Sequence, residues 1–148
     1  MAKTLAEARK ILVRVPNWVG DAVLSLPALD RLREKFPAAE ITVLARPTVA
    51  DLYRTRPGVN QVILFDHRTR HRGGSGLVRL AGELRAGRFD LAVLFQNAFQ
   101  AALLAWLARI PRRVGYARDA RGPLLTDAIR VPRAAEIPPH ETYYYLEL

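Results

Sequence analysis

Arg14-Val15-Pro16-Asn17-Trp18-Val19-Gly20-Asp21 joins a short apolar segment to a helical pattern, and this junction decides the fold. Residues 11–15 form a β-branched apolar run that is closed by a proline, which predicts a buried strand. From residue 23 to residue 36, apolar residues recur every three or four positions and predict a helix. Pro27 lies in the early turns of this pattern, where we expect a kink or a restart of the helix. One carboxylate, Asp21, therefore stands where the helix should begin.

Alternating strand and helix patterns continue beyond this junction. The further strand candidates are residues 41–45, 61–65, 89–95, 112–116 and 128–131, and the helix candidates are residues 47–54, 77–84 and 98–108. The last helix is apolar almost all round, so we expect it to be buried. Residues 66–76 are polar, basic and glycine-rich, and they predict a mobile loop. Strands that alternate with helices predict an α/β, Rossmann-like domain, in which a parallel sheet carries helices on both faces.

The length and composition indicate a single domain. The chain has 148 residues, 50% of them hydrophobic, and no run approaches the ~20 apolar residues of a membrane span. The first ten residues lack an apolar secretory core, so we expect a cytoplasmic protein. The sequence has no cysteine, which excludes disulfides, thiolate metal sites and a cysteine nucleophile. Its three histidines lack ligand spacing and no G-x-G-x-x-G follows the first strand, so we expect neither metal nor cofactor.

The net charge of +9 favours an anionic partner such as nucleic acid, acidic lipid or a phosphorylated substrate. All but three of the 23 basic residues are arginine, whose guanidinium group can pair with phosphate or carboxylate through two hydrogen bonds. Genomic base composition is an alternative explanation for so many arginines. Two clusters stand out, arginines 68, 70 and 72 in the glycine-rich loop and arginines 109, 112, 113, 118 and 121 around the fifth strand. Each cluster could bind an anionic substrate or form a solvated basic face.

Three polar segments directly follow predicted strands, and they are residues 16–21, 66–76 and 96–97. Because ligands of such sheets bind beyond the carboxyl ends of the strands, we expect these segments at one edge. Asp21 could act there as a general base or only cap the helix. Trp18 could stack on a sugar or pack on its own loop, and Asn97 could bind a sugar hydroxyl or cap the next helix.

Three ordered motifs give the sequence a specific resemblance to a known family. The first motif is Val15-Pro16-Asn17-Trp18-Val19-Gly20-Asp21-Ala22-Val23-Leu24-Ser25-Leu26-Pro27-Ala28-Leu29, and the others are residues 94–103 and 113–126. Together they resemble the ADP-heptose:lipopolysaccharide heptosyltransferases. Residues 140–146, His-Glu-Thr-Tyr-Tyr-Tyr-Leu, are similar to the segment that joins the two domains of this family.

The resemblance implies a GT-B glycosyltransferase, in which two Rossmann-like domains face a cleft. Residues 1–132 would form the amino-terminal domain, which binds the inner core of lipopolysaccharide as acceptor. Residues 133–148 would form the interdomain linker and the start of a helix. The carboxyl-terminal domain, which holds ADP-heptose in this family, would be absent, so we expect the chain to be inactive by itself. A lipid-anchored acceptor would also imply peripheral contact with the inner membrane.

The resemblance also implies roles for single residues. Asp21 matches the family's G-D motif and would be the general base of an inverting heptose transfer. The residues expected to bind the acceptor are Asn17, Trp18, Gly20, Arg72, Gln96, Asn97, Arg118 and Arg121. Arg118 and Arg121 lie inside the third motif, which favours them over the other arginines.

Two other functions are alternatives to the transferase. A basic nucleic-acid-binding domain would explain the charge, but the sequence lacks RRM, zinc-finger and homeodomain signatures, so we expect no nucleic-acid partner. A non-catalytic sugar- or lipid-binding α/β module would share the fold of the transferase half and differ only in lacking turnover.

Overall fold

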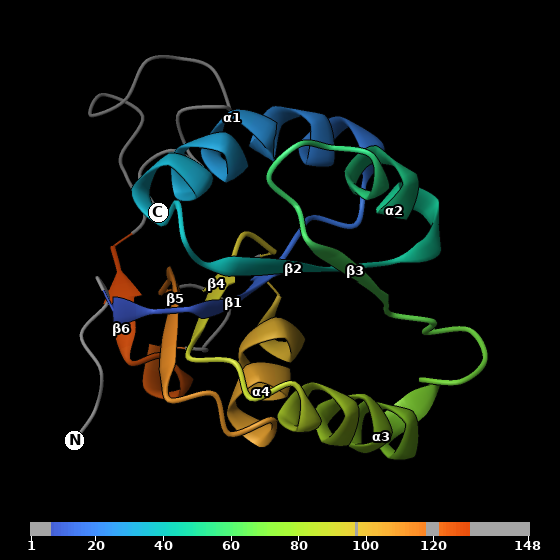
Figure 1. Cartoon of the computed structure of the whole chain (residues 1–148). Coiled ribbons are helices and arrows are strands. Elements are labelled where there is room, and N and C mark those ends of the chain that lie inside the picture. The colour runs from blue at the N-terminus through green and yellow to red at the C-terminus, as the bar shows by residue number, and fades with distance from the viewer. Residues whose placement is uncertain (1–6, 97, 118–121, 131–148) are drawn as a thin grey trace.

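The computed structural model describes residues 7–96, 98–117 and 122–130. Within these residues, a six-stranded parallel sheet has the strand order β3-β2-β1-β4-β5-β6 (Figure 1). The strands are β1 (Lys10–Arg14), β2 (Glu40–Ala45), β3 (Gln61–Leu64), β4 (Leu91–Leu94), β5 (Arg112–Tyr116) and β6 (Asp127–Ile129). The helices are α1 (Val19–Lys35), α2 (Pro47–Arg54), α3 (Gly73–Ala86) and α4 (Phe99–Leu107), with a short 3₁₀ helix, η2 (Gly122–Leu124). This architecture confirms the predicted Rossmann-like fold.

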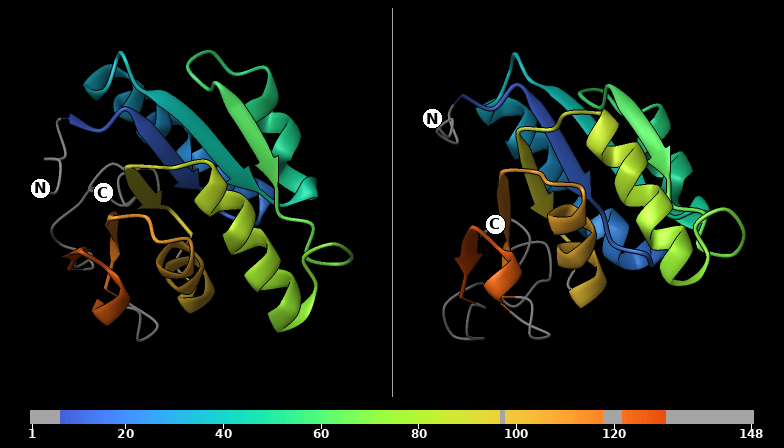
Figure 2. Two further views of the ribbon diagram at one scale, coloured as in Figure 1. Left: turned by 60° about the horizontal axis from the view of Figure 1, so that its bottom comes forward. Right: turned by 90° about the horizontal axis from the view of Figure 1, so that it is seen from below.

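Two layers of helices enclose the sheet. The helices α1 and α2 cover one face, and α3 and α4 cover the other (Figures 1 and 2). Side chains of β1 alternate between the two layers, because Ile11 and Val13 pack into the core on the α1 side and Leu12 packs into the core on the α3 side. Buried residues of β2 and β4 alternate in the same way. The central strands are therefore buried on both faces, as is typical of parallel sheets.

The predicted strands are present, and most of their limits shift by one or two residues. The limits of β5 are confirmed, whereas β4 begins at Leu91 and not at residue 89. Asp90, which was predicted to lie in this strand, precedes it instead. Its Oδ2 atom accepts hydrogen bonds from the backbone N–H groups of Arg9 and Lys10, at 2.9 and 3.0 Å. It therefore fixes the start of β1. The last strand, β6, covers residues 127–129 and not 128–131.

Pro27 lies inside α1, which runs without interruption from Val19 to Lys35. The expected restart of the helix at this proline is therefore wrong. Proline cannot donate a hydrogen bond to the carbonyl four positions earlier, that of Val23, and its ring crowds that carbonyl. Both Val23 and Pro27 are exposed, so solvent can satisfy the carbonyl and the helix tolerates the proline.

The helix α4 is not buried all round, contrary to the prediction. Ala101 and Ala102 are buried, and Leu104 packs into the core on the α3 side of the sheet. Phe99 and Trp106, however, are 44% and 49% exposed. Apolar composition therefore predicts that α4 packs against the sheet, but it does not predict which side of the helix is covered.

The helix α2 carries a buried tyrosine, Tyr53. Tyr53 is fully buried, and among the described residues its hydroxyl oxygen has no partner with hydrogen-bond geometry. Burial raises the pKa of Tyr53 to about 12, although Ser25, Arg14 and Arg56 partly oppose this rise. Between the unfolded value near 10.0 and the folded value, the folded protein keeps a proton that the unfolded chain loses. This contribution to stability is complete below the unfolded pKa and is lost as the pH rises through the folded pKa.

We expect Tyr53→Phe to remove this loss of stability. At neutral pH the variant should be as stable as the wild type or about 1 kcal/mol more stable, because it buries no unpaired hydroxyl. Urea unfolding at about pH 8 and about pH 11 should show a smaller fall in the free energy of unfolding for the variant than for the wild type. The pKa of Arg14 is lowered to about 9, so its deprotonation raises the stability of the folded protein as the pH rises. Arg14 is present in both proteins, so this effect does not account for a difference between them. Equal pH dependence of the two proteins would contradict the prediction.

Candidate functional site

The strand β1 lies where the direction of winding of the sheet changes. It pairs with β2 on one side and with β4 on the other. The chain leaves β1 through α1 toward β2, whereas it leaves β4 through α4 toward β5 on the opposite side. The loops after β1 and β4 therefore diverge at the carboxyl edge of the sheet, which is where ligands of doubly wound sheets bind.

Hydrogen bonds join these two loops. The backbone N–H groups of Phe95 and Gln96 both donate to the Arg14 carbonyl oxygen at 3.0 Å. The backbone N–H of Asn17 donates to Gln96 Oε1 at 3.3 Å. Asn17 Oδ1 accepts a hydrogen bond of 2.7 Å from Arg14 Nη2, so the Asn17 amide NH₂ group points its donors elsewhere. The structure thus brings together two predicted site residues, Asn17 and Gln96.

Asp21 is the third residue of α1. The helix begins at Val19, its N-cap residue is Trp18, and no side chain caps it. The alternative that Asp21 is the cap is therefore wrong. Asp21 is partly exposed and makes no hydrogen bond or ion pair with any residue that the structure describes. Its carboxylate is therefore not committed to a contact within the described residues.

The neighbours of Asp21 leave space on the same turn. Trp18 is 75% exposed, so its ring does not pack on its own loop as one alternative expected. A Cβ atom at Gly20 would meet no other heavy atom within 4 Å. Gly20 is part of the helix α1, so this glycine provides open space beside the backbone and is not needed for an unusual backbone conformation. An exposed aromatic surface and an uncrowded backbone therefore flank the carboxylate in the chain.

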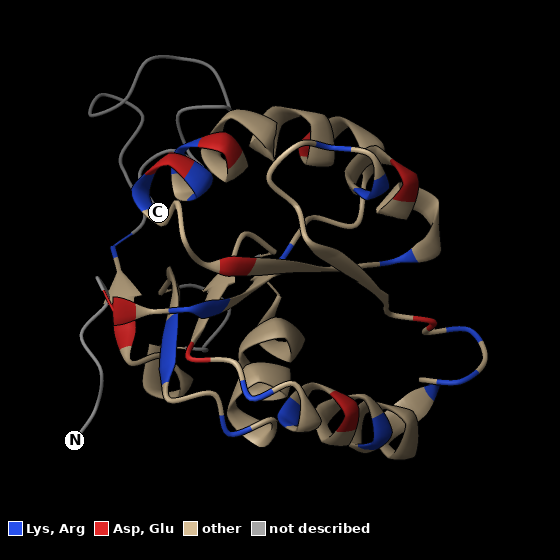
Figure 3. Cartoon of the chain, viewed as in Figure 1, with Lys and Arg blue, Asp and Glu red and all other residues tan. Residues whose placement is uncertain are grey.

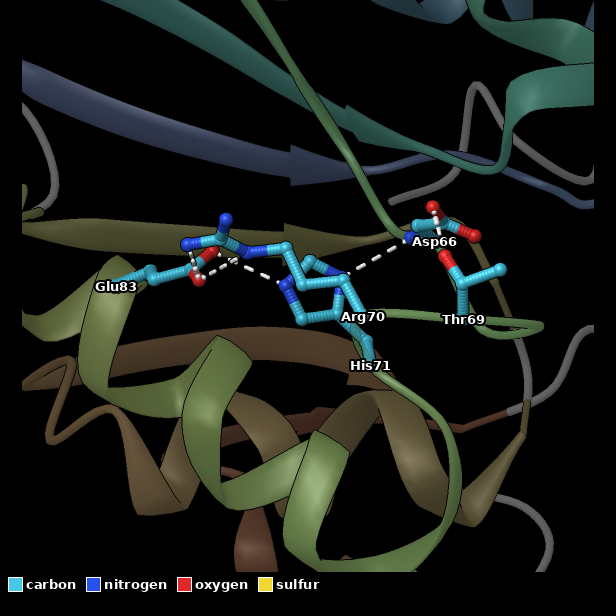
Figure 4. A network of polar contacts seen from close by, with 5 residues as sticks. All are labelled: Asp66, Thr69, Arg70, His71 and Glu83. Atoms are coloured by element: carbon cyan, nitrogen blue, oxygen red, sulfur yellow. Dashed lines mark hydrogen bonds and ion pairs between the residues drawn. The ribbon is translucent and has the colours of Figure 1, made fainter.

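A network of polar contacts holds the loop that follows β3 (Figure 4). His71 is buried, and its Nδ1 atom accepts a hydrogen bond of 3.0 Å from the backbone N–H of Asp66. Because Nδ1 is the acceptor, the neutral ring carries its proton on Nε2, which donates to Glu83 Oε2 at 3.1 Å. Arg70 donates to Glu83 Oε1 from Nε and Nη2, at 2.8 and 2.7 Å. The hydroxyl of Thr69 donates to the Asp66 carboxylate.

These contacts contradict the expected mobile loop. The last residues of the predicted loop, from Gly73 onward, belong to α3, and the preceding residues are held by the network. The Thr69 hydrogen bond lowers the pKa of Asp66. For Glu83, burial acts to raise the pKa, but the hydrogen bonds from Arg70 and His71 outweigh it and lower the pKa. Arg70 is therefore engaged with an ionised carboxylate through two of its nitrogen atoms.

Other predicted acceptor residues lie apart from Asp21 or outside the described residues. Arg72 is exposed and is the N-cap residue of α3, and it follows β3, two strands away from β1. Among the described contacts, none joins Arg72 to Asn17 or Asp21. Asn97, Arg118 and Arg121 lie outside the described residues, as does the predicted domain boundary at residues 132 and 133. The N-cap residue of α4 is Ala98 and not Asn97.

Two arginines of the fifth strand have structural partners. Arg112 donates to both carboxylate oxygens of Asp127, at 3.0 and 2.8 Å. Arg113 donates to the carbonyl oxygens of Leu124 and Ile110, at 2.6 and 2.7 Å. Both side chains therefore stabilise β5 and the segments beside it. The sequence analysis expected these arginines either to bind an anionic substrate or to form a solvated basic face, and it did not expect this structural role.

Sequence reasoning misses two arginines at the carboxyl edge. Arg14 ends β1 and is only 3% exposed, and Arg46 follows β2 and is partly buried. Their guanidinium carbons lie 5.3 and 5.7 Å from the centre of the Phe65 ring. Burial lowers the pKa of Arg14 to about 9, and the charge of Arg46 adds to this effect. The sequence did contain a signal for them, since an arginine stands at the end of each of two apolar strands. Charged residues are rarely buried, so an arginine at such a position indicates a special role.

Charge is otherwise distributed over the surface. Figure 3 shows acidic and basic residues interspersed along the helices, with basic residues gathered on the loop that follows β3. Among the described residues, no group of three or more His, Asp or Glu side chains is arranged to hold a metal ion. In the same part of the chain, no helix has the length and apolarity needed to cross a membrane.

Sequence comparison finds relatives among glycosyltransferases. The sequence model of glycosyltransferase family 9 (heptosyltransferase) matches residues 77–146. Lipopolysaccharide heptosyltransferase 2 of Salmonella typhimurium is 36% identical to this chain over 125 residues, which cover 80% of this chain and 34% of that protein. The chain thus spans about a third of the length of the curated relatives it matches.

Comparison with solved structures gives the same result. The E. coli ADP-heptose LPS heptosyltransferase II is 33% identical, with a TM-score of 0.78 over 94% of this chain and 39% of that chain. A family 9 glycosyl transferase from Veillonella parvula is 25% identical, with a TM-score of 0.80 over 94% of this chain and 40% of that chain. These likenesses confirm the resemblance that the three sequence motifs indicate.

Proposed function

Since this chain is related to the heptosyltransferases of glycosyltransferase family 9, we propose that it forms the acceptor-binding half of such an enzyme. The proposed reaction transfers heptose from ADP-heptose to the inner core of lipopolysaccharide, with inversion at the sugar carbon. The chain spans about a third of its relatives' length, so we assign ADP-heptose to a carboxyl-terminal domain beyond the described residues. The natural polypeptide would work at the cytoplasmic face of the inner membrane, where a net charge of +9 favours peripheral contact.

The observation that carries this proposal is the placement of Asp21. Its partly exposed carboxylate has no partner among the described residues and lies at the edge where the loops after β1 and β4 diverge. A base at this point would face a ligand that sits beyond the carboxyl ends of the strands. A carboxylate that is not committed to the fold is suited to take up a proton.

The proposed chemistry uses Asp21 as a general base. The acceptor hydroxyl oxygen attacks the heptose carbon that carries the diphosphate, and a new carbon–oxygen bond forms as the bond to the diphosphate oxygen breaks. The hydroxyl proton passes to the Asp21 carboxylate, and ADP leaves with the electron pair of the broken bond. Removal of the proton during attack lowers the barrier, because it prevents positive charge from building up on the acceptor oxygen.

The residues around Asp21 suit a sugar acceptor. Trp18 offers an exposed ring face on which a sugar can stack, and the Asn17 amide NH₂ group can donate to a hydroxyl. Gln96 is held against Asn17, so the two amides would act on one ligand. Gly20 leaves space beside them. We keep Arg72, Asn97, Arg118 and Arg121 as acceptor-binding residues in this proposal.

The positive charge gives less support to a nucleic-acid-binding domain. Several arginines on the surface are paired with carboxylates, and the described pairs are Arg31–Glu34, Arg54–Asp51, Arg56–Asp30, Arg70–Glu83 and Arg112–Asp127. Arg33 donates to the backbone carbonyls of Gly58 and Ala39, and so it too serves the fold. Duplex binding with a steep dependence on salt would favour the nucleic-acid alternative.

A direct test uses the 148-residue chain alone. We expect it to bind an inner-core oligosaccharide acceptor in isothermal titration calorimetry and to show no binding of ADP-heptose. It should transfer no heptose when both substrates are supplied, because the donor site is assigned to a further domain. Tight ADP-heptose binding without acceptor binding would reverse the proposed division of labour, and turnover by the chain alone would exclude it.

A further inference from the structure

Two guanidinium groups at the carboxyl edge share one aromatic ring. Arg14 ends β1, Arg46 follows β2, and both lie over Phe65, which follows β3. Their guanidinium carbons are 5.3 and 5.7 Å from the ring centre, and the ring itself is buried. Stacking on an aromatic face offsets part of the cost of burying a cation. It does not remove the repulsion between two like charges on the same ring.

A third arginine adds to this repulsion. The pKa of Arg46 is lowered by burial first and by the charge of Arg68 second. Burial likewise lowers the pKa of His67, and Arg46 contributes to the shift, so His67 is neutral near pH 7. The edge formed by the ends of β1, β2 and β3 therefore collects three cations that oppose one another.

Within the described residues, no carboxylate forms an ion pair with these cations. Among the described residues, the Arg14 guanidinium group donates to the Val15 carbonyl oxygen and to Asn17 Oδ1, both at 2.7 Å, and both acceptors are uncharged. Neither Arg46 nor Arg68 is in any of the described ion pairs. The adjacent acid, Asp66, accepts the hydrogen bond of Thr69.

The cluster also contains buried polar atoms without partners. Arg46 Nε and His67 Nδ1 are both buried, and neither has a hydrogen-bond partner among the described residues. Buried donors in folded proteins are almost always satisfied, so an unsatisfied guanidinium N–H calls for an acceptor. Stacking on Phe65 fixes the orientation of Arg46 but gives this N–H no acceptor.

The cluster is graded from the interior to the surface. Arg14 is almost completely buried, Arg46 is partly buried and Arg68 is exposed. A ligand arriving from solvent can therefore reach Arg68 and Arg46, while Arg14 supplies positive charge beneath them. Guanidinium groups form two-pronged hydrogen bonds to oxyanions, which suits them to phosphate.

We propose that Arg14, Arg46 and Arg68 form a phosphate-binding subsite at the ends of β1, β2 and β3. Its ligand is a phosphate monoester group, whose two negative charges match three arginines outside the described ion pairs better than a single carboxylate does. The proposal rests on the proposed function only for the molecule that bears the group, which would be a phosphorylated acceptor sugar. Binding of inorganic phosphate tests the subsite without any transfer reaction.

The test measures binding of inorganic phosphate to the 148-residue chain by calorimetry at constant ionic strength. We expect saturable binding that weakens about tenfold or more in Arg46→Gln, which removes the charge and the unsatisfied N–H. The matched control is Arg79→Gln on α3, an exposed arginine without a described partner, and it should bind phosphate as the wild type does. Equal affinity of Arg46→Gln and Arg79→Gln, or no saturable binding to the wild type, would overturn the proposal.

Three further experiments sharpen the outcome. Arg68→Gln changes an exposed residue and should fold as the wild type does, so a lower phosphate affinity in this variant supports the subsite even if Arg46→Gln is unstable. Acetate that competes with phosphate at equal concentration would overturn the assignment to phosphate. Asp21→Asn should bind phosphate normally, so failure of the subsite and failure of the proposed base are distinguishable.

Discussion

Asp21→Asn is expected to lower the rate of heptose transfer by about 10²–10⁴-fold, which is the usual contribution of a general base. Asparagine keeps the size and shape of aspartate, but its amide cannot accept the proton of the acceptor hydroxyl. Asp21 has no described partner, so the substitution leaves no neighbour unpaired and the fold should persist. The measurement, on the two-domain enzyme proposed above, is the release of ADP and the transfer of heptose with both substrates saturating.

Asp51→Asn is the matched control for this experiment. Asp51 lies on α2 with an exposed side chain and pairs with Arg54 at 2.7 Å. Exposed pairs of this kind contribute about 0–1 kcal/mol, so the control should unfold at nearly the wild-type urea concentration and keep its turnover. Asp21→Asn should likewise keep the KM for the acceptor. A variant with the wild-type kcat would exclude Asp21 as the base.

A purely structural role for Asp21 predicts a different result. A carboxylate in the first turn of a helix interacts favourably with the helix dipole, which contributes about 0.3–1 kcal/mol at an exposed site. If this were its function, Asp21→Asn would lower the free energy of unfolding by that amount and leave transfer intact. Unfolding and turnover measured on the same variant therefore separate the two roles.

The parallel sheet could be predicted because its strands are buried on both faces. Residues 11–15 and 41–45 are apolar without alternation, and this pattern is typical of central strands in an α/β sheet. The right-handedness of βαβ units then predicted a Rossmann-like domain, although the order of the strands came only from the structure. The position of Asp21 at the carboxyl edge followed from its segment, which comes directly after the first predicted strand. In these segments the local sequence pattern agrees with the fold, so the sequence alone was sufficient to predict the strands.

The cationic cluster could not be predicted, because it depends on contacts between three separate strands. Arg14 and Arg46 are 32 positions apart, and only the order β3-β2-β1 places both over Phe65. The same limit applies to the loop after β3. Its composition suggests mobility, but Glu83, in the last turn of α3, holds Arg70 and His71 in place. The composition of a segment describes only that segment, whereas whether the segment is ordered depends on the residues that pack against it.

Gly76→Ala is expected to destabilise the protein by about 3 kcal/mol, because the new methyl group has no space. A Cβ atom at Gly76 would lie 2.1 Å from the backbone carbon of His71 and 2.6 Å from its Cα and carbonyl oxygen atoms. These are backbone atoms, so the loop must move away from α3 as a whole. Such a movement would break the hydrogen bonds that His71 makes to Asp66 and Glu83. Urea unfolding at neutral pH measures the loss.

Gly82→Ala on the same helix should have the opposite effect. Gly82 is exposed within α3, and a Cβ atom there would meet no other heavy atom within 4 Å. Alanine lowers the entropy of the unfolded chain, so this variant should be about 0.5–1 kcal/mol more stable than the wild type. Stabilisation by both substitutions would show that His71 does not pack against α3 at Gly76. Because the displaced loop also carries Arg68, Gly76→Ala should weaken phosphate binding while Gly82→Ala leaves it unchanged, which ties the order of this loop to the proposed subsite.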